Sequence, residues 1–264
     1  MPKPAASLAD SLRIASYNVH GCVGADGRKD AARIAAVIAE TQCDTAGLQE
    51  VDYRLDYIAM RLGMQAVPGL TLLRHDGPFG NALVTRRRVL DVRRLAFGYG
   101  RREPRNALDV DLEVGGRPLR VIVTHLGLFA AERRYQMRKL LEIIRRNPAH
   151  QPIVVLGDMN EWLPLSRPLR WLNGILGASL AERSFPARWP LFALDRVWVR
   201  PRHALLALKA HRSPLAAAAS DHLPVKALIA PESAQASRTA VNAHHPEDDK
   251  AAPRRAIGAL RRMR

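Results

Sequence analysis

The chain has 264 residues, of which 47% are hydrophobic and 25% are charged, as in ordinary globular proteins. Its apolar runs fall short of the roughly 18 residues that cross a bilayer, and its N-terminus lacks the apolar core of a secretory signal, so we expect a cytoplasmic location. The formal net charge of +16 is carried mostly by arginine and favours anionic partners such as phosphates, nucleic acid or acidic lipid.

The first half of the chain alternates between patterns typical of strands and helices. Ile34, Val37 and Ile38 share one face of a predicted helix, and Gly63 is suited to end a second one. In order, the predicted elements are a strand over 12–17, a helix over 29–41, a strand over 44–50, a helix over 53–63, and strands over 81–85 and 88–97. The mixture indicates an α/β protein without defining how its layers are arranged.

The clearest strand pattern in the second half lies at residues 107–114, where apolar residues alternate with Asp109, Asp111 and Glu113. Such alternation predicts a half-buried strand. The elements predicted after it are a strand over 119–124, a helix over 131–147, and strands over 153–156, 195–199 and 224–229.

The composition divides the chain into one large region and two short ends. We expect a flexible N-terminus over residues 1–11, a single catalytic domain over 12–230, and a basic, disordered tail over 231–264. The tail ends in RRAIGALRRMR, which is either solvated or a short basic helix that makes peripheral contact with an acidic membrane surface.

Residues able to bind a metal or move a proton recur at the ends of the predicted strands. Ordinary turns favour Gly, Pro, Ser and Asn, so a repeated set of carboxylates and imidazoles at these positions indicates a reaction site. The residues are Asn18, His20, Gln49, Glu50, His125, Asp158, Asn160, Asp195, Ser220, Asp221 and His222.

The types of side chain in this set indicate its chemistry. Glu50, Asp158 and Asp221 offer hard oxygen ligands, which suit Mg²⁺ or Mn²⁺ rather than zinc. His125 and His222 remain for proton transfer near neutral pH. Together these groups suit hydrolysis of a phosphoester, in which a divalent cation offsets the charge at phosphorus and a water attacks in line.

Seven short motifs together resemble the endonuclease/exonuclease/phosphatase superfamily of deoxyribonuclease-like hydrolases. They occur in that superfamily's order and span residues 12–230. They are RIASYNVHG, LQEVD, GNALVTR, VTHLG, VVLGDMN, LDRVWV and SDHLPV. The resemblance implies a four-layer α/β sandwich, with two mixed β-sheets packed face to face and helices outside.

The resemblance also implies roles for the matching residues. Glu50, Asn18 and Asp221 would form the metal site for Mg²⁺ or Mn²⁺, with Asn18 holding a water or a carboxylate. Asp158 and Asn160 would orient the attacking water and contact the phosphate.

The same resemblance makes His125 and His222 candidates for acid and base, with Asp195 holding His222. Three further residues are candidates for substrate binding, each with a plainer alternative. His20 and Arg105 could simply be solvated, and Asn81 could only fix a turn.

The substrate stays open between two kinds of anionic phosphoester. His125, which matches deoxyribonuclease-like members, and the charge of +16 favour DNA or RNA. Val51-Asp52 stands where abasic-site enzymes carry a lysine, and the loop over 183–190 is aromatic and proline-rich. These features favour a phospholipid headgroup or a sugar phosphate.

Segments 102–110 and 183–190 resemble a little-characterised bacterial branch of the superfamily. That branch does not bring a known substrate with it. We expect a phosphodiesterase in preference to a phosphomonoesterase. A nuclease is one alternative. A catalytically inactive module that binds phosphate or nucleic acid is the other.

Overall fold

The computed structural model describes residues 11–75, 77–148 and 150–230, and within them the chain forms two β-sheets. The first sheet has the strand order β10 (Leu205–Ala210), β11 (Val225–Ile229), β1 (Leu12–Asn18), β2 (Thr45–Val51), β4 (Gly77–Thr85) and β3 (Gln65–Arg74). The second has the order β5 (Val89–Ala96), β6 (Asn106–Val114), β7 (Arg117–His125), β8 (Ile153–Asp158) and β9 (Asp195–Arg200).

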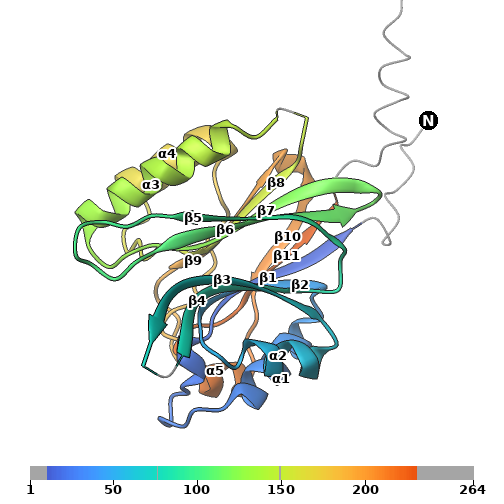
Figure 1. The fold of residues 1–264 in the computed structure, drawn as a ribbon, viewed down its shortest axis with the longest axis vertical. Coiled ribbons are helices and arrows are strands. Elements are labelled where there is room, and N and C mark those ends of the chain that lie inside the picture. The colour runs from blue at the N-terminus through green and yellow to red at the C-terminus, as the bar shows by residue number, and fades with distance from the viewer. Residues whose placement is uncertain (1–10, 76, 149, 231–264) are drawn as a thin grey trace, which may run out of the picture.

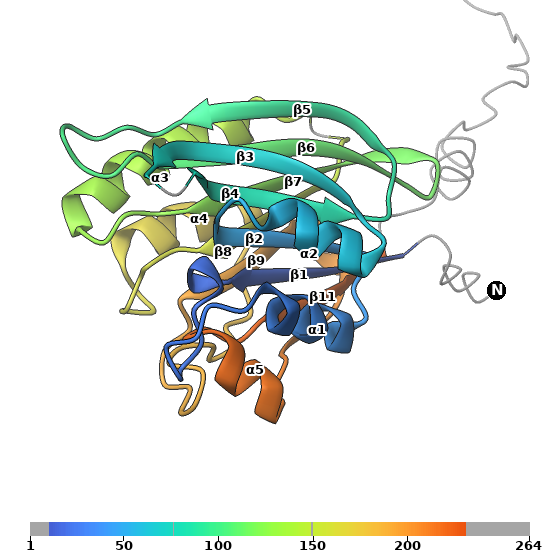
Figure 2. The ribbon, with the colours of Figure 1, turned by 60° about the horizontal axis from the view of Figure 1, so that its bottom comes forward.

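Helices cover the outer face of each sheet, so the molecule has four layers (Figures 1 and 2). Over the first sheet lie α1 (Ala31–Thr41), α2 (Leu55–Leu62) and α5 (Pro214–Ala219), and over the second lie α3 (Ala130–Arg145) and α4 (Arg167–Leu176). The predicted four-layer α/β sandwich is therefore confirmed. No helix in the described part of the chain is long and apolar enough to cross a membrane.

The inner faces of the two sheets share one apolar core. On β6, the alternating residues Leu108, Val110, Leu112 and Val114 all point into it, as their pattern predicts. The opposite face of β6 is more buried than the alternation suggests, because Asp109 is fully buried there. Its carboxylate is paired with arginines of the neighbouring strands.

The ends of six strands meet along one edge of the sandwich. β1 runs parallel to β2 in one sheet, and β7 runs parallel to β8 in the other. Asp158, at the end of β8, lies in register with His125 on one side and with Asp195, the first residue of the antiparallel β9, on the other. This topology brings the polar strand ends together.

Among the α-helices and strands of the described residues, four were not indicated by the sequence, namely β3, β10, α4 and α5. Both strands are at the edges of the first sheet, where a strand has a partner on one side only. β3 also contains Pro68, which is tolerated at an edge because its missing N–H is not needed there. The expected tail over 231–264 and all but the last residue of the N-terminal segment lie outside the described residues.

The strand that carries Asp158 depends on a glycine. Gly157 has a φ of +146°, and a β-carbon added to it would lie 1.8 Å from the carbonyl oxygen of Thr124. We expect Gly157→Ala to lower the free energy of unfolding by about 3 kcal/mol, because it adds both backbone strain and a clash. Urea denaturation followed by circular dichroism measures this change.

The matched control is Gly174→Ala in α4. A β-carbon there meets nothing within 4 Å, so the substitution should raise the free energy of unfolding by up to about 1 kcal/mol through helix propensity. A Gly157→Ala variant as stable as the wild type would contradict the prediction.

A second prediction concerns Asp109, whose carboxylate accepts from Arg120 Nη2 at 2.5 Å and from Arg93 Nη2 at 2.9 Å. Burial would raise its pKa, but the two guanidinium groups outweigh burial and lower it. A carboxyl whose pKa is lowered on folding contributes stability above its unfolded pKa of about 4, and this contribution is lost as the pH falls through the folded pKa.

We therefore expect Asp109→Asn to lower the free energy of unfolding by about 3 kcal/mol near pH 7, because both arginines lose their buried partner. The gap to the wild type should shrink in urea titrations as the pH falls below about 4. Asp91→Asn removes an exposed partner of Arg93 and should cost less than about 1 kcal/mol. Equal losses for the two variants would contradict the assignment.

Candidate active site

Asn18 connects the two sheets at the centre of the site. Its side-chain nitrogen donates to Glu50 Oε1 at 3.3 Å and to Asp158 Oδ2 at 3.1 Å, while its oxygen accepts from the backbone N–H of His20 at 3.0 Å. Asn18 is the last residue of β1 and is 1% exposed. It thus holds one carboxylate from each sheet by a single amide group.

Glu50 faces the site because the backbone of β2 is irregular at this residue. The pairing of β2 with β4 shifts in register between Leu48 and Val51, and Glu50 has a φ of +56°. Irregularities of this kind redirect a side chain at the end of a strand. Burial opposes the charge on Glu50, but His20, His125 and Asn18 outweigh burial and hold its pKa well below the usual range, so the carboxylate is ionised.

Asp158 lies deeper, at the end of β8. Its Oδ1 accepts from the backbone N–H of Asn160 at 2.8 Å, and its Oδ2 lies 3.8 Å from His222 Nε2. Burial raises the pKa of Asp158 to about 6, although the charge of His222 opposes the shift. A carboxyl with a pKa near neutrality suits proton transfer.

His222 is held by the buried carboxylate of Asp195. His222 Nδ1 lies 2.7 Å from Asp195 Oδ2, which also accepts from the Ser184 hydroxyl at 2.6 Å. Burial would lower the pKa of His222, but the charges and hydrogen bond of Asp195, together with Asp158, raise it to about 10. The ring of Phe185 packs against the imidazole with 4.8 Å between centroids, so His222 has a fixed orientation.

His125 lies on the other side of Asp158. Its Nε2 is 3.5 Å from Asp158 Oδ2 and 3.8 Å from Glu50 Oε1, and 3.0 Å from the Asn160 amide nitrogen. Arg105 Nη1 lies 3.2 Å from its Nδ1. The Arg105 guanidinium and the Asn160 amide nitrogen can only donate, so they approach the two ring nitrogens as competing donors, and a neutral ring accepts from one of them. Burial, with Arg105, lowers the pKa of His125 to about 3.

His20 and Asp221 form the solvent side of the site. His20 Nδ1 lies 3.7 Å from Glu50 Oε2 and 3.7 Å from Asp221 Oδ2. The hydrogen bond with Glu50 is the main reason that the pKa of His20 is raised. His20 therefore contacts two carboxylates and is not simply a solvated loop residue.

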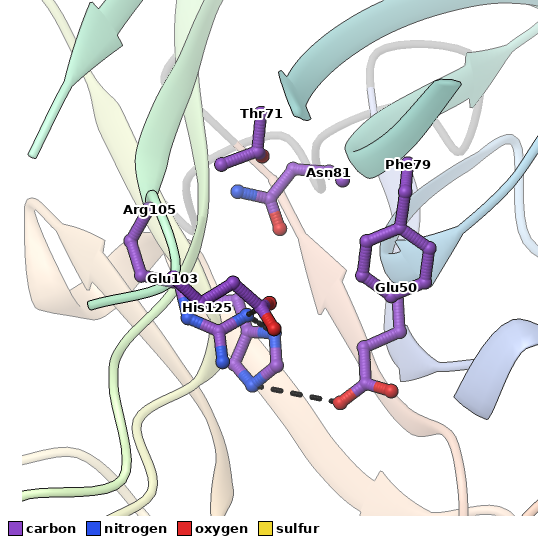
Figure 3. Close-up of a pocket in the computed structure, with 8 residues that line it drawn as sticks. Glu50, Thr71, Phe79, Asn81, Glu103, Arg105 and His125 are labelled. Carbon is purple, nitrogen blue, oxygen red and sulfur yellow. Dashed lines mark hydrogen bonds and ion pairs between the residues drawn. The ribbon is translucent and has the colours of Figure 1, made fainter. Parts of the chain in front are cut away.

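A pocket opens beside Glu50 and His125 (Figure 3). The Asn81 amide nitrogen donates to Asn106, but its Oδ1 is buried and has no hydrogen-bond partner among the described residues. Arg105 forms an ion pair with Glu103 at 3.0 Å on the pocket wall. The residues that line the pocket are Glu50, Thr71, Phe79, Gly80, Asn81, Glu103, Arg105 and His125.

The structure brings together all the residues to which the sequence assigned a catalytic, metal-binding or substrate-binding role, namely Asn18, His20, Glu50, Asn81, Arg105, His125, Asp158, Asn160, Asp195, Asp221 and His222. Nine are connected by the contacts described above, and Asn81 and Arg105 line the adjoining pocket. The sequence did not single out Ser184, Phe185 as a partner of His222, or Thr71. Serine and threonine are common in loops and strands, so nothing in their local sequence distinguishes them.

Two groups of side chains could hold a divalent cation. Glu50 and Asp221 place one carboxylate oxygen each on the solvent side of the site, where both oxygens lie 3.7 Å from His20 Nδ1. Asp158, Asp195 and His222 also place one possible ligand atom each within 4.8 Å of one another. In that second group the Asp195 oxygen already accepts from His222 and Ser184, so we regard Asp195 as the partner that orients His222. Asn18 donates to the carboxylates of Glu50 and Asp158, so it is suited to holding these groups in position.

The chain belongs to the endonuclease/exonuclease/phosphatase family, whose model matches residues 15–222. Among curated proteins, it is 27% identical over 186 residues to the uncharacterized protein YbhP of Escherichia coli (strain K12). That match covers 66% of this chain and 72% of YbhP. Members of the family are phosphoesterases that generally depend on a metal.

Solved structures share the fold. An endonuclease/exonuclease/phosphatase from Beutenbergia cavernae is 24% identical with a TM-score of 0.65, and the match covers 83% of this chain and 71% of that one. D. rerio TDP2 complexed with a single-strand DNA product is 19% identical with a TM-score of 0.63, over 83% of this chain and 98% of that one. At these identities the likeness shows the fold alone.

The hydrogen bonds of Asn18 lead to a test that keeps the shape of the side chain. Asn18→Asp replaces the donor with a third carboxylate facing Glu50 and Asp158. We expect it to lower the free energy of unfolding by about 3 kcal/mol near pH 7, because a buried charge then lacks a partner. Urea denaturation in the presence of EDTA, which prevents rescue by a bound cation, measures the effect.

The control for this prediction is Asn173→Asp. Asn173 uses its side-chain oxygen as an acceptor from Trp198 Nε1 at 2.8 Å, so an aspartate keeps that bond and should change stability by less than about 1 kcal/mol. Similar losses in the two variants would mean that Asn18 does not act as a donor between carboxylates.

Proposed function

We propose that the protein is a divalent-metal-dependent hydrolase of phosphoesters, with phosphodiesters as its preferred substrates. One observation carries the proposal: Glu50, Asp158 and His222 come from three distant segments and meet around Asn18 and His125 in a buried, hydrogen-bonded cluster. Buried carboxylates are costly unless they are paired or have a ligand. A cluster of this kind is therefore typical of a site with a chemical role.

The donor set fits a hard cation, because it offers carboxylate oxygens and no thiolate. Glu50 and Asp221 would hold Mg²⁺ or Mn²⁺, with Asn18 fixing the Glu50 carboxylate in place. When bound, the cation would offset the negative charge that grows on the phosphoryl oxygens.

The protein's own groups account for the remaining steps. Asp158 and Asn160 would orient the attacking water, and Asp158, whose pKa is raised to about 6 by burial, would take up the proton of that water. His222, held by Asp195, and His125, whose Nε2 lies 3.5 Å from Asp158 Oδ2, would be the imidazoles that contact the phosphate and supply a proton to the leaving oxygen.

Groups on two sides of the cluster support a diester in particular. The pocket with Arg105 and Asn81 lies beside His125, while Phe185 lies against His222. A phosphodiester carries a substituent on each side of phosphorus. One substituent could contact the pocket, and the other could contact Phe185. His20, Arg105 and Asn81 would bind the substrate, Arg105 through a charge-assisted hydrogen bond to phosphate.

A nuclease is the second candidate. It is favoured by the net charge of +16, and a structural neighbour, TDP2 of D. rerio, was solved with a single-strand DNA product. Binding to DNA through such charge should weaken steeply as salt rises. An inactive binding module of the same fold would bind its ligand without turnover.

Hydrolysis of bis-(p-nitrophenyl) phosphate with Mg²⁺, Mn²⁺ or EDTA tests the proposal. We expect activity that EDTA abolishes, and we expect Asp158→Asn and His222→Ala to lower kcat by roughly 100-fold or more, as for loss of a general acid or base. His150→Ala is the control, because His150 is exposed on the loop before β8, away from the site.

A panel of DNA, RNA, phospholipids and sugar phosphates then separates the substrate classes. Full activity in His222→Ala or Asp158→Asn would contradict the proton-transfer roles proposed for these two residues. Calorimetry that detects no binding of Mg²⁺, together with no turnover on any substrate, would favour the inactive module.

A further inference from the structure

Exposed apolar side chains gather in three loops that border the site. These loops cover residues 126–130, 159–166 and 184–193, and they directly adjoin the site residues His125, Asp158 and Asp195 in the chain. Eight of the fifteen exposed large hydrophobic residues in the described part of the protein lie in them. The loops form a small share of the chain, so this concentration is not what a random surface gives.

The three loops form one continuous surface, which we call the apolar rim. The first and second loops are joined by Arg133 of α3, which donates to the Leu128 carbonyl in the first loop and to Glu161 Oε1 in the second at 2.8 Å. The second and third are joined by edge-to-face contact of Trp162 with Phe192, at 4.9 Å between ring centroids. Through Phe185 the same aromatic group reaches His222, so the rim borders the reacting centre.

Half of the rim is aliphatic. Its four leucines are between 62% and 81% exposed, and they are Leu128, Leu163, Leu165 and Leu191. Aromatic rings can stack on nucleic-acid bases, but a leucine at the tip of a loop has no such partner and is stabilised only when it leaves water. The leucines therefore favour a lipid phase over a nucleic acid as the partner of this surface.

Basic side chains accompany the apolar ones. Arg167 and Arg188 are exposed within or next to the rim, and Arg102 lies over the Phe129 ring at 3.5 Å. The exposed carboxylate nearest in sequence to Arg102 is Glu103, which is neutralised by ion pairs with Arg74 and Arg105. Positive charge beside protruding apolar residues is the combination that binds anionic lipid headgroups while the apolar tips enter the interface.

We propose that the apolar rim docks the protein on the surface of an anionic lipid bilayer, with the mouth of the site facing the headgroups. The substrate is then a phosphoester of a membrane lipid, an inference that rests on the proposed function. The docking itself does not require turnover. It uses folded loops of the catalytic domain and is independent of the basic tail.

Sedimentation with vesicles of phosphatidylcholine containing one third phosphatidylglycerol tests the proposal on the full chain, in EDTA so that no lipid is hydrolysed. We expect the wild type to bind these vesicles and to bind pure phosphatidylcholine vesicles much more weakly. The double variant Leu163→Ser, Leu165→Ser should bind about 10-fold more weakly or worse, because it lacks two apolar side chains that would leave water for the lipid interface.

The matched control is the double variant Leu90→Ser, Leu206→Ser. Leu90 and Leu206 are the second residues of β5 and β10, at the opposite edge of the sandwich, and both are exposed. This control variant should bind anionic vesicles as tightly as the wild type does. Equal binding by the two double variants, or no binding of the wild type to anionic vesicles, would overturn the proposal, provided that circular dichroism shows equal thermal stability.

A single-stranded oligonucleotide is the competing ligand. If the Leu163→Ser, Leu165→Ser variant loses oligonucleotide binding while vesicle binding is unchanged, the rim is a nucleic-acid surface and the proposal is wrong. Hydrolysis of soluble bis-(p-nitrophenyl) phosphate should survive in this variant, which separates docking from chemistry. A wild type that binds vesicles but hydrolyses no phosphoester would sink the proposed function and leave the docking surface standing.

Discussion

The hydrogen bonds of Asn18 to Glu50 and Asp158 are the constraint on which the site depends. The two carboxylates come from different sheets, and without a donor between them their charges would repel in a region poor in water. One amide satisfies both, and its oxygen fixes the following turn through His20. The relative position of the two sheets is thus tied to the geometry of the site.

The same cluster separates its ionisable groups by environment. Burial raises the pKa of Asp158, whereas contacts with His20, His125 and Asn18 lower that of Glu50. The two histidines also differ, because His222 faces carboxylates and His125 faces a guanidinium. Pairs of like groups held in different protonation states allow one site to supply both a proton donor and a proton acceptor.

Sequence reasoning predicted which polar residues lie close together more completely than it predicted the fold. These residues could be predicted because they interrupt apolar strands at their ends, where Glu50, Asp158 and His222 are hard to explain as ordinary turn residues. The face-to-face layering was available only through the family resemblance, since alternating patterns define the faces of a strand but not its neighbours. The edge strands β3 and β10 were not predicted for a related reason, because half-exposed strands carry a weaker apolar pattern.

The contacts that hold the catalytic candidates were the least predictable part. Ser184 and Asp195 meet because a loop of the chain folds back on β9, and Asp109 is buried by arginines from two neighbouring strands. Neither contact has a local signal, since each joins side chains that lie apart in the chain. A resemblance to known motifs indicates the residues that are expected to react, whereas only coordinates give the residues that contact and orient them.

The location of the apolar rim follows from the same topology. Loops at the ends of the strands are free of core packing, so the chain can place polar groups at the centre of this edge and apolar groups around it. A surface that covers the rim also displaces water from the mouth of the site. Charges there would then be less screened, and the attraction of Arg105 and the imidazoles for a phosphate would strengthen. If both proposals hold, docking and chemistry would be coupled through the dielectric environment of a single edge of the sandwich.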